Sequence, residues 1–214
     1  MYLIRRPSVR PEFLQQGCVA TIGAFDGLHL GHRRILDQVT AIAEEHGLPT
    51  LLFSFEPTPK EYFARQSPPA RLMRFREKYT ALQELGVDAF FCPRFEPALE
   101  GLSPDDFVDN ILVKLLNVKH LVVGDDFRFA RKRAGTLADL ERKGLEQGFS
   151  VQQVGSVELD GLRVSSSEVR QVLASGDMEQ ARRMLGDRYR MSGKVVRGRQ
   201  LGREPVSYTH LRAH

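Results

Sequence analysis

The sequence lacks the features that mark several classes of protein. It has only two cysteines, Cys18 and Cys92, and both lie in apolar runs, so we expect reduced core residues rather than a disulfide or metal ligands. No apolar run reaches the roughly 18 residues that a membrane span requires. Residues 1–11 contain no apolar core of a signal peptide, and the chain has no internal repeat or low-complexity segment. These absences favour a globular protein of the cytoplasm that does not enter a membrane.

The positive charge is concentrated at the C-terminal end. Residues 187–214 hold seven Lys and Arg against two acids, a surplus of five, which leaves residues 1–186 at −1 from a total of +4. A nearly neutral main domain argues against a nucleic-acid-binding face. One basic cluster lies inside it, and it fits a solvated loop as well as a polyphosphate site: Arg128, Arg131, Lys132 and Arg133.

The most informative stretch is Gly23-Ala24-Phe25-Asp26-Gly27-Leu28-His29-Leu30-Gly31-His32. It follows a β-branched apolar run at 18–22 and precedes apolar residues at helical spacing, so it lies on a strand-to-helix turn. Glycines let a ligand approach the backbone, and a helix start favours a phosphate. His29 and His32 are three apart, so one turn can direct both at the same anion.

Other phosphate loops and a plain surface turn are the alternatives for this stretch. The Lys-Ser/Thr of a Walker loop is missing, and the spacing differs from the G-x-G-x-x-G of dinucleotide-binding proteins. Two surface histidines on an ordinary glycine-rich turn remain possible, but the flanking strand and helix favour the phosphate site.

Strand-like and helix-like patterns alternate along the chain, which predicts an α/β fold with a doubly wound parallel sheet and helices on both faces. In such sheets ligands bind beyond the carboxyl ends of the strands, and the candidate motifs all follow predicted strands. The predicted strands are 19–25, 50–55, 89–95, 121–124 and 151–157, and the predicted helices are 32–45, 75–85, 104–116, 137–147, 166–174 and 178–185.

Two later motifs carry polar groups at strand ends. Asp125 and Asp126 follow a buried strand, where adjacent carboxylates are costly unless they are solvated or serve a ligand. After the fifth strand, Ser165 and Ser166 begin a helix whose hydroxyl and N–H groups suit a phosphate, and Arg170 is long enough to reach it. A plain capping box formed by Ser165 with the glutamate three residues later is the alternative.

Taken together, these motifs resemble those of bacterial FAD synthetases, which carry the His-x-Gly-His signature of the nucleotidylyltransferase superfamily with its Rossmann-like fold. The resemblance implies that His29 and His32 hold the α- and β-phosphates of ATP, that Arg170 and Ser166 grip the leaving pyrophosphate, and that Asp126 contacts the nucleotide. The expected catalytic residues are His29, His32 and Arg170, and the expected ATP site comprises Gly23, Phe25, Asp26, Gly31, His32, Asp126, Ser165, Ser166 and Arg170.

Two positions depart from the family pattern. Thr58 stands where the family often has the histidine of a Pro-His-Pro motif, so a stiff loop is favoured over a ligand role there. Ala130 stands where the family has a glycine, and a positive φ at that position would strain an alanine.

The resemblance covers residues 14–203. It implies an FMN adenylyltransferase domain at 1–186, and at 187–214 the start of the β-barrel riboflavin kinase domain that follows in such enzymes. Residues 204–214 depart from the family and resemble foreign sequence. We therefore expect the chain to make FAD from FMN but not FMN from riboflavin.

The reaction expected from the resemblance belongs to FAD biosynthesis. It transfers AMP from ATP to FMN and gives FAD and pyrophosphate, with Mg²⁺ arriving on ATP and no metal held by the protein alone. Two alternatives stay open: a nucleotidylyltransferase of the same fold that acts on another phosphorylated acceptor, and a regulator that binds nucleotide without turnover.

Overall fold

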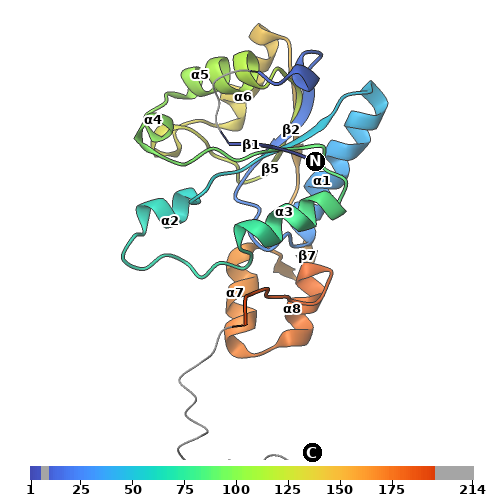
Figure 1. Ribbon diagram of the computed structural model, residues 1–214, viewed down its shortest axis with the longest axis vertical. Helices are drawn as coiled ribbons and strands as arrows, with labels where there is room; N and C mark the ends of the chain where they lie inside the picture. The colour runs from blue at the N-terminus through green and yellow to red at the C-terminus, as the bar shows by residue number, and fades with distance from the viewer. Residues whose placement is uncertain (6–9, 196–214) are drawn as a thin grey trace, which may run out of the picture.

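The computed structural model describes residues 1–5 and 10–195, and its centre is a six-stranded sheet in which every neighbouring pair is parallel (Figure 1). The spatial order is β1-β4-β3-β2-β5-β6. The strands are β1 (Tyr2–Ile4), β2 (Cys18–Ile22), β3 (Thr50–Phe53), β4 (Ala89–Phe91), β5 (Val118–Gly124) and β6 (Ser150–Val154). The predicted α/β class with a doubly wound parallel sheet is confirmed.

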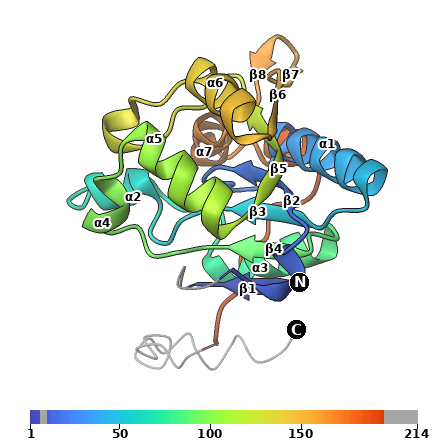
Figure 2. The same cartoon turned by 90° about the horizontal axis from the view of Figure 1, so that it is seen from above.

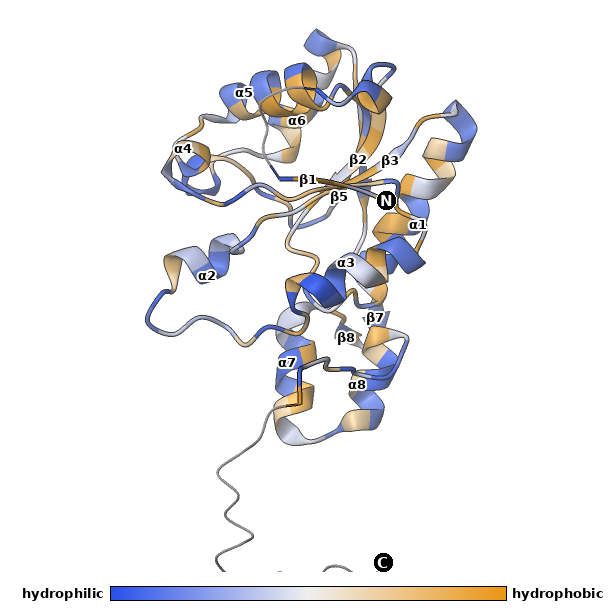
Figure 3. Ribbon diagram, viewed as in Figure 1, coloured by the Kyte–Doolittle hydropathy of each residue, from blue (hydrophilic) through white to orange (hydrophobic). Residues whose placement is uncertain are grey.

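Helices cover both faces of this sheet, as the view from above illustrates (Figure 2). One face carries α5 (Pro104–Asp106), the π-helix η2 (Phe107–Leu115) and α6 (Leu137–Gln147). The other carries α1 (Leu30–His46) and α3 (Phe75–Glu84). Strand residues alternate between the faces: Ala20 and Ile22 pack with the first group of helices, and Val19 packs with α1. The strands are mostly hydrophobic, and the helices mix hydrophobic and hydrophilic turns (Figure 3).

A smaller layer lies beyond the carboxyl ends of the strands. It contains α7 (Ser166–Ser175) and α8 (Met178–Leu185), whose Val169 and Met184 pack on Leu72 and Val164 in a cluster of their own. A two-stranded hairpin, β7 (Glu158–Leu159) with β8 (Leu162–Arg163), leads into it. The short helices α2 (Pro59–Phe63) and α4 (Pro97–Glu100) complete the loops after β3 and β4, and the 3₁₀ turns are η1 (Glu12–Leu14) and η3 (Arg131–Arg133).

The order of the strands creates a switch point. From β2 the chain proceeds through α1 to β3 and then to β4 on one side, whereas β5 and β6 lie on the other side of β2. Ligands of open α/β sheets bind at such a point, outside the carboxyl ends of the strands. The loops that follow β2 and β5 therefore flank the expected site.

Several predicted boundaries are wrong in detail. The strands predicted at 19–25, 50–55, 89–95 and 151–157 all end earlier, at Ile22, Phe53, Phe91 and Val154. The edge strand β1 and the hairpin escaped prediction, since both are too short for a periodic pattern. The helix predicted at 104–116 divides into α5 and η2.

The end of the described chain forms no barrel strand. Residues 187–195 contain neither helix nor strand, so the β-barrel fragment predicted from residue 187 is not seen there. The remainder of that prediction, including the foreign segment at 204–214, lies outside the described residues. Within residues 1–5 and 10–195, none of the helices has the length and apolar content that crossing a bilayer requires.

Candidate active site

Three aromatic rings stack at the turn between β2 and α1. The centroids of the His29 and His32 rings lie 3.7 Å apart and nearly parallel, and the His32 ring lies 4.6 Å from that of Phe25. His29 is the N-cap of α1 and His32 lies in its first turn, so the two predicted histidines do meet at a helix start. Each ring is thus fixed by a neighbour, and the pair is presented at the switch point.

The backbone of this turn is strained. Phe25 and Leu28 adopt positive φ values of 46° and 42°, a region that bulky residues rarely occupy. Of the turn's glycines, Gly27 shares this conformation, with φ of 89°. Gly23 is needed for a different reason: a Cβ there would come within 2.9 Å of the Phe25 ring, which folds back over it. Strain of this kind persists only where the surrounding structure over-determines the conformation, and it concentrates at functional sites.

Hydrogen bonding fixes the tautomer of His29. Its Nδ1 accepts the backbone N–H of His32 at 3.4 Å, so in the neutral ring the proton is on Nε2. Burial lowers the pKa of His29 to about 4, with Arg163 pushing the same way and the carboxylates of Asp26 and Asp126 opposing. His29 is therefore a neutral donor through Nε2 at pH 7.

The second ring has the same character. Burial, and then the neighbouring His29 and Lys78, hold the pKa of His32 well below its usual value. Its Nδ1 is buried with no hydrogen-bond partner among the described residues. Because a buried N–H without an acceptor is rarer than a buried acceptor without a donor, the proton belongs on Nε2 of this ring too. Two neutral N–H donors are thus available side by side.

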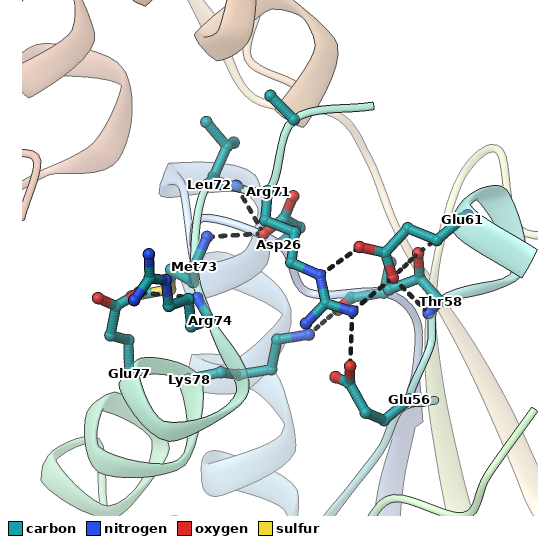
Figure 4. A network of polar contacts seen from close by, with 12 residues as sticks. Asp26, Glu56, Thr58, Glu61, Arg71, Leu72, Met73, Arg74, Glu77 and Lys78 are labelled. Carbon is teal, nitrogen blue, oxygen red and sulfur yellow. Dashed lines mark hydrogen bonds and ion pairs between the residues drawn. The ribbon is translucent and has the colours of Figure 1, made fainter. Parts of the chain in front are cut away.

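Asp26 is a structural hub and not a free carboxylate. Its oxygens accept the backbone N–H groups of Leu72 and Met73 at 2.9–3.1 Å (Figure 4). One of them pairs with the guanidinium of Arg170 at 2.5 Å. Both partners of the ion pair are largely buried. The side chain predicted to contact ATP therefore joins the β2–α1 turn to residues 70–73 and to α7.

Arg170 and the serines are also engaged by the protein. The Arg170 Nε donates to the carbonyl of Ala70 at 2.6 Å, and Nη1 donates to that of Ser166 at 3.1 Å. Among the described residues, one N–H on each terminal nitrogen has no acceptor and is left for a ligand. Ser165 caps α7 by accepting the N–H of Glu168, which is one half of the capping box considered as the alternative; the reciprocal bond to the Glu168 side chain is not among the hydrogen bonds of the described residues. The Ser166 hydroxyl donates to the Asp26 carbonyl at 2.8 Å.

The two aspartates after β5 have different environments. Asp125 accepts the backbone N–H and hydroxyl of Ser156 and pairs with Arg163 at 2.9 Å, and these contacts, the Ser156 hydroxyl first, hold its pKa below the usual range. The Asp126 side chain is 75% exposed, with Arg163 at 3.2 Å. Asp125 thus ties the loop to the β6–β7 connection, and Asp126 is the one accessible to a ligand.

Arg71 organises the loop that follows β3. Its guanidinium contacts Glu61 and donates to Glu56 at 2.6 Å, so it lies between the two carboxylates (Figure 4). Thr58 is the N-cap of α2 in a full capping box with Glu61. The residue at this departure from the family pattern therefore stabilises a helix start, as the stiff-loop interpretation expects.

Ala130 has the strained conformation that the missing glycine implied. Its φ of 62° and ψ of −170° lie in a region used almost only by glycine. The next residues of the basic cluster, Lys132 and Arg133, also have positive φ, and both are exposed. The loop is closed at its base by paired backbone hydrogen bonds between Phe129 and Gly135.

Prediction missed Lys78 and Arg163. Lys78 lies on α3 and its Nζ reaches the carbonyl of Ala24, while Arg163 contacts both aspartates after β5. From the sequence alone, a single lysine on an amphipathic helix is interpreted as a surface residue. An arginine in a short hairpin belongs to no local pattern that indicates a function. In the described part of the chain, no three His, Cys, Asp or Glu side chains converge as a protein-held metal site requires.

The sheet order and the histidine pair at its switch point define a Rossmann-like α/β protein of the nucleotidylyltransferase class. The FAD synthetase family matches residues 12–168, and the chain belongs to this family. A bifunctional riboflavin kinase/FMN adenylyltransferase from Pseudomonas fluorescens is 47% identical over 197 residues, which cover 92% of this chain and 62% of the relative. The protein of the same description from Escherichia coli K12 is 43% identical over 203 residues, covering 95% and 65%.

A crystal structure described as a macrolide-efflux protein from Streptococcus pneumoniae superposes with a TM-score of 0.75 at 24% identity. The superposition covers 92% of this chain and 65% of the matched chain, and at this identity the likeness supports the fold alone. The chain spans less than two thirds of the length of the two relatives above.

Proposed function

We propose that this chain transfers the adenylyl group of ATP to FMN and so forms FAD and pyrophosphate. The observation that carries the proposal is the stacked pair of neutral histidines at the start of α1, with their Nε2–H groups beside a helix N-terminus at the switch point of the sheet. Such a helix start attracts phosphate, and neutral N–H donors add hydrogen bonds to it. The names of the relatives, which include FMN adenylyltransferase, support the choice of substrates.

The chemistry requires no strong base. A phosphomonoester such as FMN has a second pKa of about 6, so its phosphate is largely dianionic at neutral pH. A phosphate oxygen of FMN attacks the α-phosphorus of ATP, the bond from that phosphorus to the bridging oxygen breaks, and pyrophosphate leaves with the electron pair. Catalysis then rests on positioning and on stabilising charge at the phosphates.

The residues have distinct roles in this proposal. His29 and His32 donate to the α- and β-phosphates, and the free N–H groups of Arg170 contact the leaving pyrophosphate. Asp126 contacts the nucleotide from the β5 loop. Asp26 and Ser166 position these groups, because their side chains are already bonded within the protein.

Other expected residues shape the site or accompany the substrate. Gly23, Phe25 and Gly31 shape the turn, and Ser165 begins the helix that carries Arg170. Mg²⁺ is proposed to arrive with ATP, since this ion is usually held by substrate phosphates and one or two carboxylates. Asp126, which is exposed beside the site, suits such a contact.

One assay separates the candidate functions. The chain is incubated with MgATP and FMN, pyrophosphate is quantified, and flavins are separated by chromatography. FAD and pyrophosphate in equal amounts support the proposal. Pyrophosphate released only with another phosphorylated acceptor would favour the alternative transferase, and nucleotide binding without pyrophosphate would favour the regulator.

The domain assignment also remains a proposal. We infer that residues 1–186 are the adenylyltransferase unit, since the sheet, its helices and the α7–α8 layer are complete by Leu185. Riboflavin kinase is part of the relatives' names, and riboflavin with MgATP is the assay for that step. Limited proteolysis that leaves a fragment near residues 1–186 with full adenylylation would support the boundary.

A further inference from the structure

Lys78 is a buried cation to which nothing above assigns a role. It lies one turn from the start of α3 and is only 4% exposed. Its Nζ donates to the carbonyl oxygen of Ala24 at 2.5 Å, in the turn that carries the histidines. Among the residues that the structure describes, no carboxylate oxygen lies within 4.0 Å of this nitrogen.

Such an arrangement is unfavourable for folding. Removing an ammonium group from water has a penalty of several kcal/mol, which a carboxylate partner normally offsets. Burial accordingly lowers the pKa of Lys78. The charged groups that act on it at longer range are Asp26, Glu56 and Arg71, together with the Cys92 thiol. A buried charge with a single carbonyl partner calls for an explanation other than stability.

The contact with Ala24 explains how Lys78 acts on the site. The carbonyl of Ala24 accepts a second hydrogen bond, from the buried Ser54 hydroxyl at 3.2 Å, so two donors from different elements fix it. The next residue is Phe25, whose φ of 46° turns its ring back onto His32. The orientation of the His32 ring therefore depends on a peptide that Lys78 holds.

The positive charge of Lys78 supports the same role as its hydrogen bond to Ala24. The ammonium is close enough to oppose a positive charge on His32, which favours the neutral ring with a donor at Nε2. It also places a fixed positive charge beneath the loop at which the phosphates of ATP are proposed to bind. Preorganised charge of this kind stabilises a transition state because it requires no rearrangement during the reaction.

We propose that Lys78 is a positioning residue for adenylyl transfer, which holds the Ala24 peptide and so sets the ring of His32 against the phosphates. This role rests on the proposed function of the site. If Lys78 has this role, its replacement should lower turnover without lowering stability. Replacing a lysine with a purely structural role would not give this combination.

The chain offers a matched control in Lys143. This lysine is 7% exposed, lies on α6 and pairs with Asp109 at 2.9 Å, with Asp105 and Glu146 within 4.0 Å. It packs on the helices of one sheet face and contacts none of the residues of the site. Removing it breaks an ion pair, so Lys143→Met should lower stability and leave turnover unchanged.

The test compares Lys78→Met, Lys78→Arg and Lys143→Met with the unmodified 214-residue chain, by thermal unfolding and by steady-state FAD formation. Lys78→Met should keep or raise the Tm and lower kcat by about tenfold or more, on the scale of a displaced catalytic group. KM for ATP and for FMN should change by less than about threefold, because no substrate contact is removed. Lys78→Arg should recover part of the lost turnover.

Two results would overturn the role of Lys78. One is a kcat of Lys78→Met within twofold of the unmodified chain. The other is a loss of kcat that accompanies a Tm decrease as large as that of Lys143→Met, with Lys78→Arg no better than Lys78→Met. Absence of FAD formation by the unmodified chain would instead overturn the proposed function, so the two failures are distinguishable.

Discussion

The loops that follow β2 and β5 flank the same switch point, and both contain residues other than glycine at positive φ. In the β2 loop these residues, Phe25 and Leu28, are each 1% exposed and lie in one apolar cluster with residues of α1 and α3, and the Phe25 ring also lies against His32. In the β5 loop Lys132 and Arg133 are exposed, with no ion pair among the described residues.

The two loops differ in the contacts that hold their strained backbone conformations. The β2 loop is fixed by contacts with distant segments, so its conformation is specified by the whole fold. In the β5 loop the contacts with distant segments include those of Asp125 with Ser156 and Arg163, near its start, whereas Lys132 and Arg133 are exposed at positive φ, so their strain costs stability without a comparable network. Changes in the first loop should therefore affect catalysis or global stability strongly, and changes in the second should have small and even favourable effects.

The largest effect is expected at the ring stack of the β2 loop. His29→Ala or His32→Ala should lower the rate of FAD formation by about 10²-fold or more, the scale of removing one preorganised donor. His120→Ala, at a histidine on β5 outside the site, is the control and should retain full turnover. Steady-state assays of the purified variants measure the difference. Near-normal FAD formation by either site variant would exclude the phosphate role.

The next largest effect is expected from replacing the carboxylate that holds each loop, which is Asp26 in the β2 loop and Asp125 in the β5 loop. Asp26→Asn leaves a largely buried arginine without its counter-charge, which should cost about 3 kcal/mol of unfolding free energy. Asp125→Asn, whose ion pair is exposed, should cost about 1 kcal/mol or less. Chemical denaturation measures both. Equal losses of unfolding free energy for the two variants would contradict the difference between the β2 loop, which is fixed by buried contacts, and the more exposed β5 loop.

A pH dependence of stability should follow from the buried histidine. His29 has a pKa of about 4 in the folded chain, against 6.5 when exposed. Between these values the unfolded chain binds a proton that the folded chain does not, so stability falls as pH decreases from 6.5 to 4. The contribution is about 3 kcal/mol. His29→Gln should flatten this slope in unfolding curves measured across that range, and an unchanged slope would contradict the burial of the ring.

The smallest effect is expected in the β5 loop. Ala130→Gly should raise the free energy of unfolding by about 1 kcal/mol, because glycine relieves the strain at φ of 62°. The control is Ala134→Gly, the same substitution at φ of −71°, which should be neutral or destabilising. Thermal unfolding measures both, and destabilisation by Ala130→Gly would mean that the loop does not hold this conformation.

Sequence reasoning predicted the alternation of strands and helices, because apolar periodicity reports burial directly. It also predicted the meeting of His29 and His32, since their spacing fixes them on one turn. It did not predict the engagement of Asp26 by Leu72 and Arg170, which are far away in sequence and are brought near only by packing. The burial of Lys78 was not predicted either, because the periodicity of a helix does not show which of its polar residues faces a loop.

The central claim, that the site holds phosphate through neutral histidine donors, is tested most directly at His32. His32→Gln keeps a neutral N–H donor near the position of Nε2, and His32→Ala removes it. Single-turnover formation of FAD from FMN and MgATP at pH 7.5 (about 1.5 units above the second pKa of a phosphomonoester) compares the two variants. The account predicts that His32→Gln reacts about tenfold or more faster than His32→Ala, on the scale of one hydrogen-bond donor to a developing charge. Equal rates for the two variants would contradict the role of His32 as a neutral hydrogen-bond donor to the phosphates.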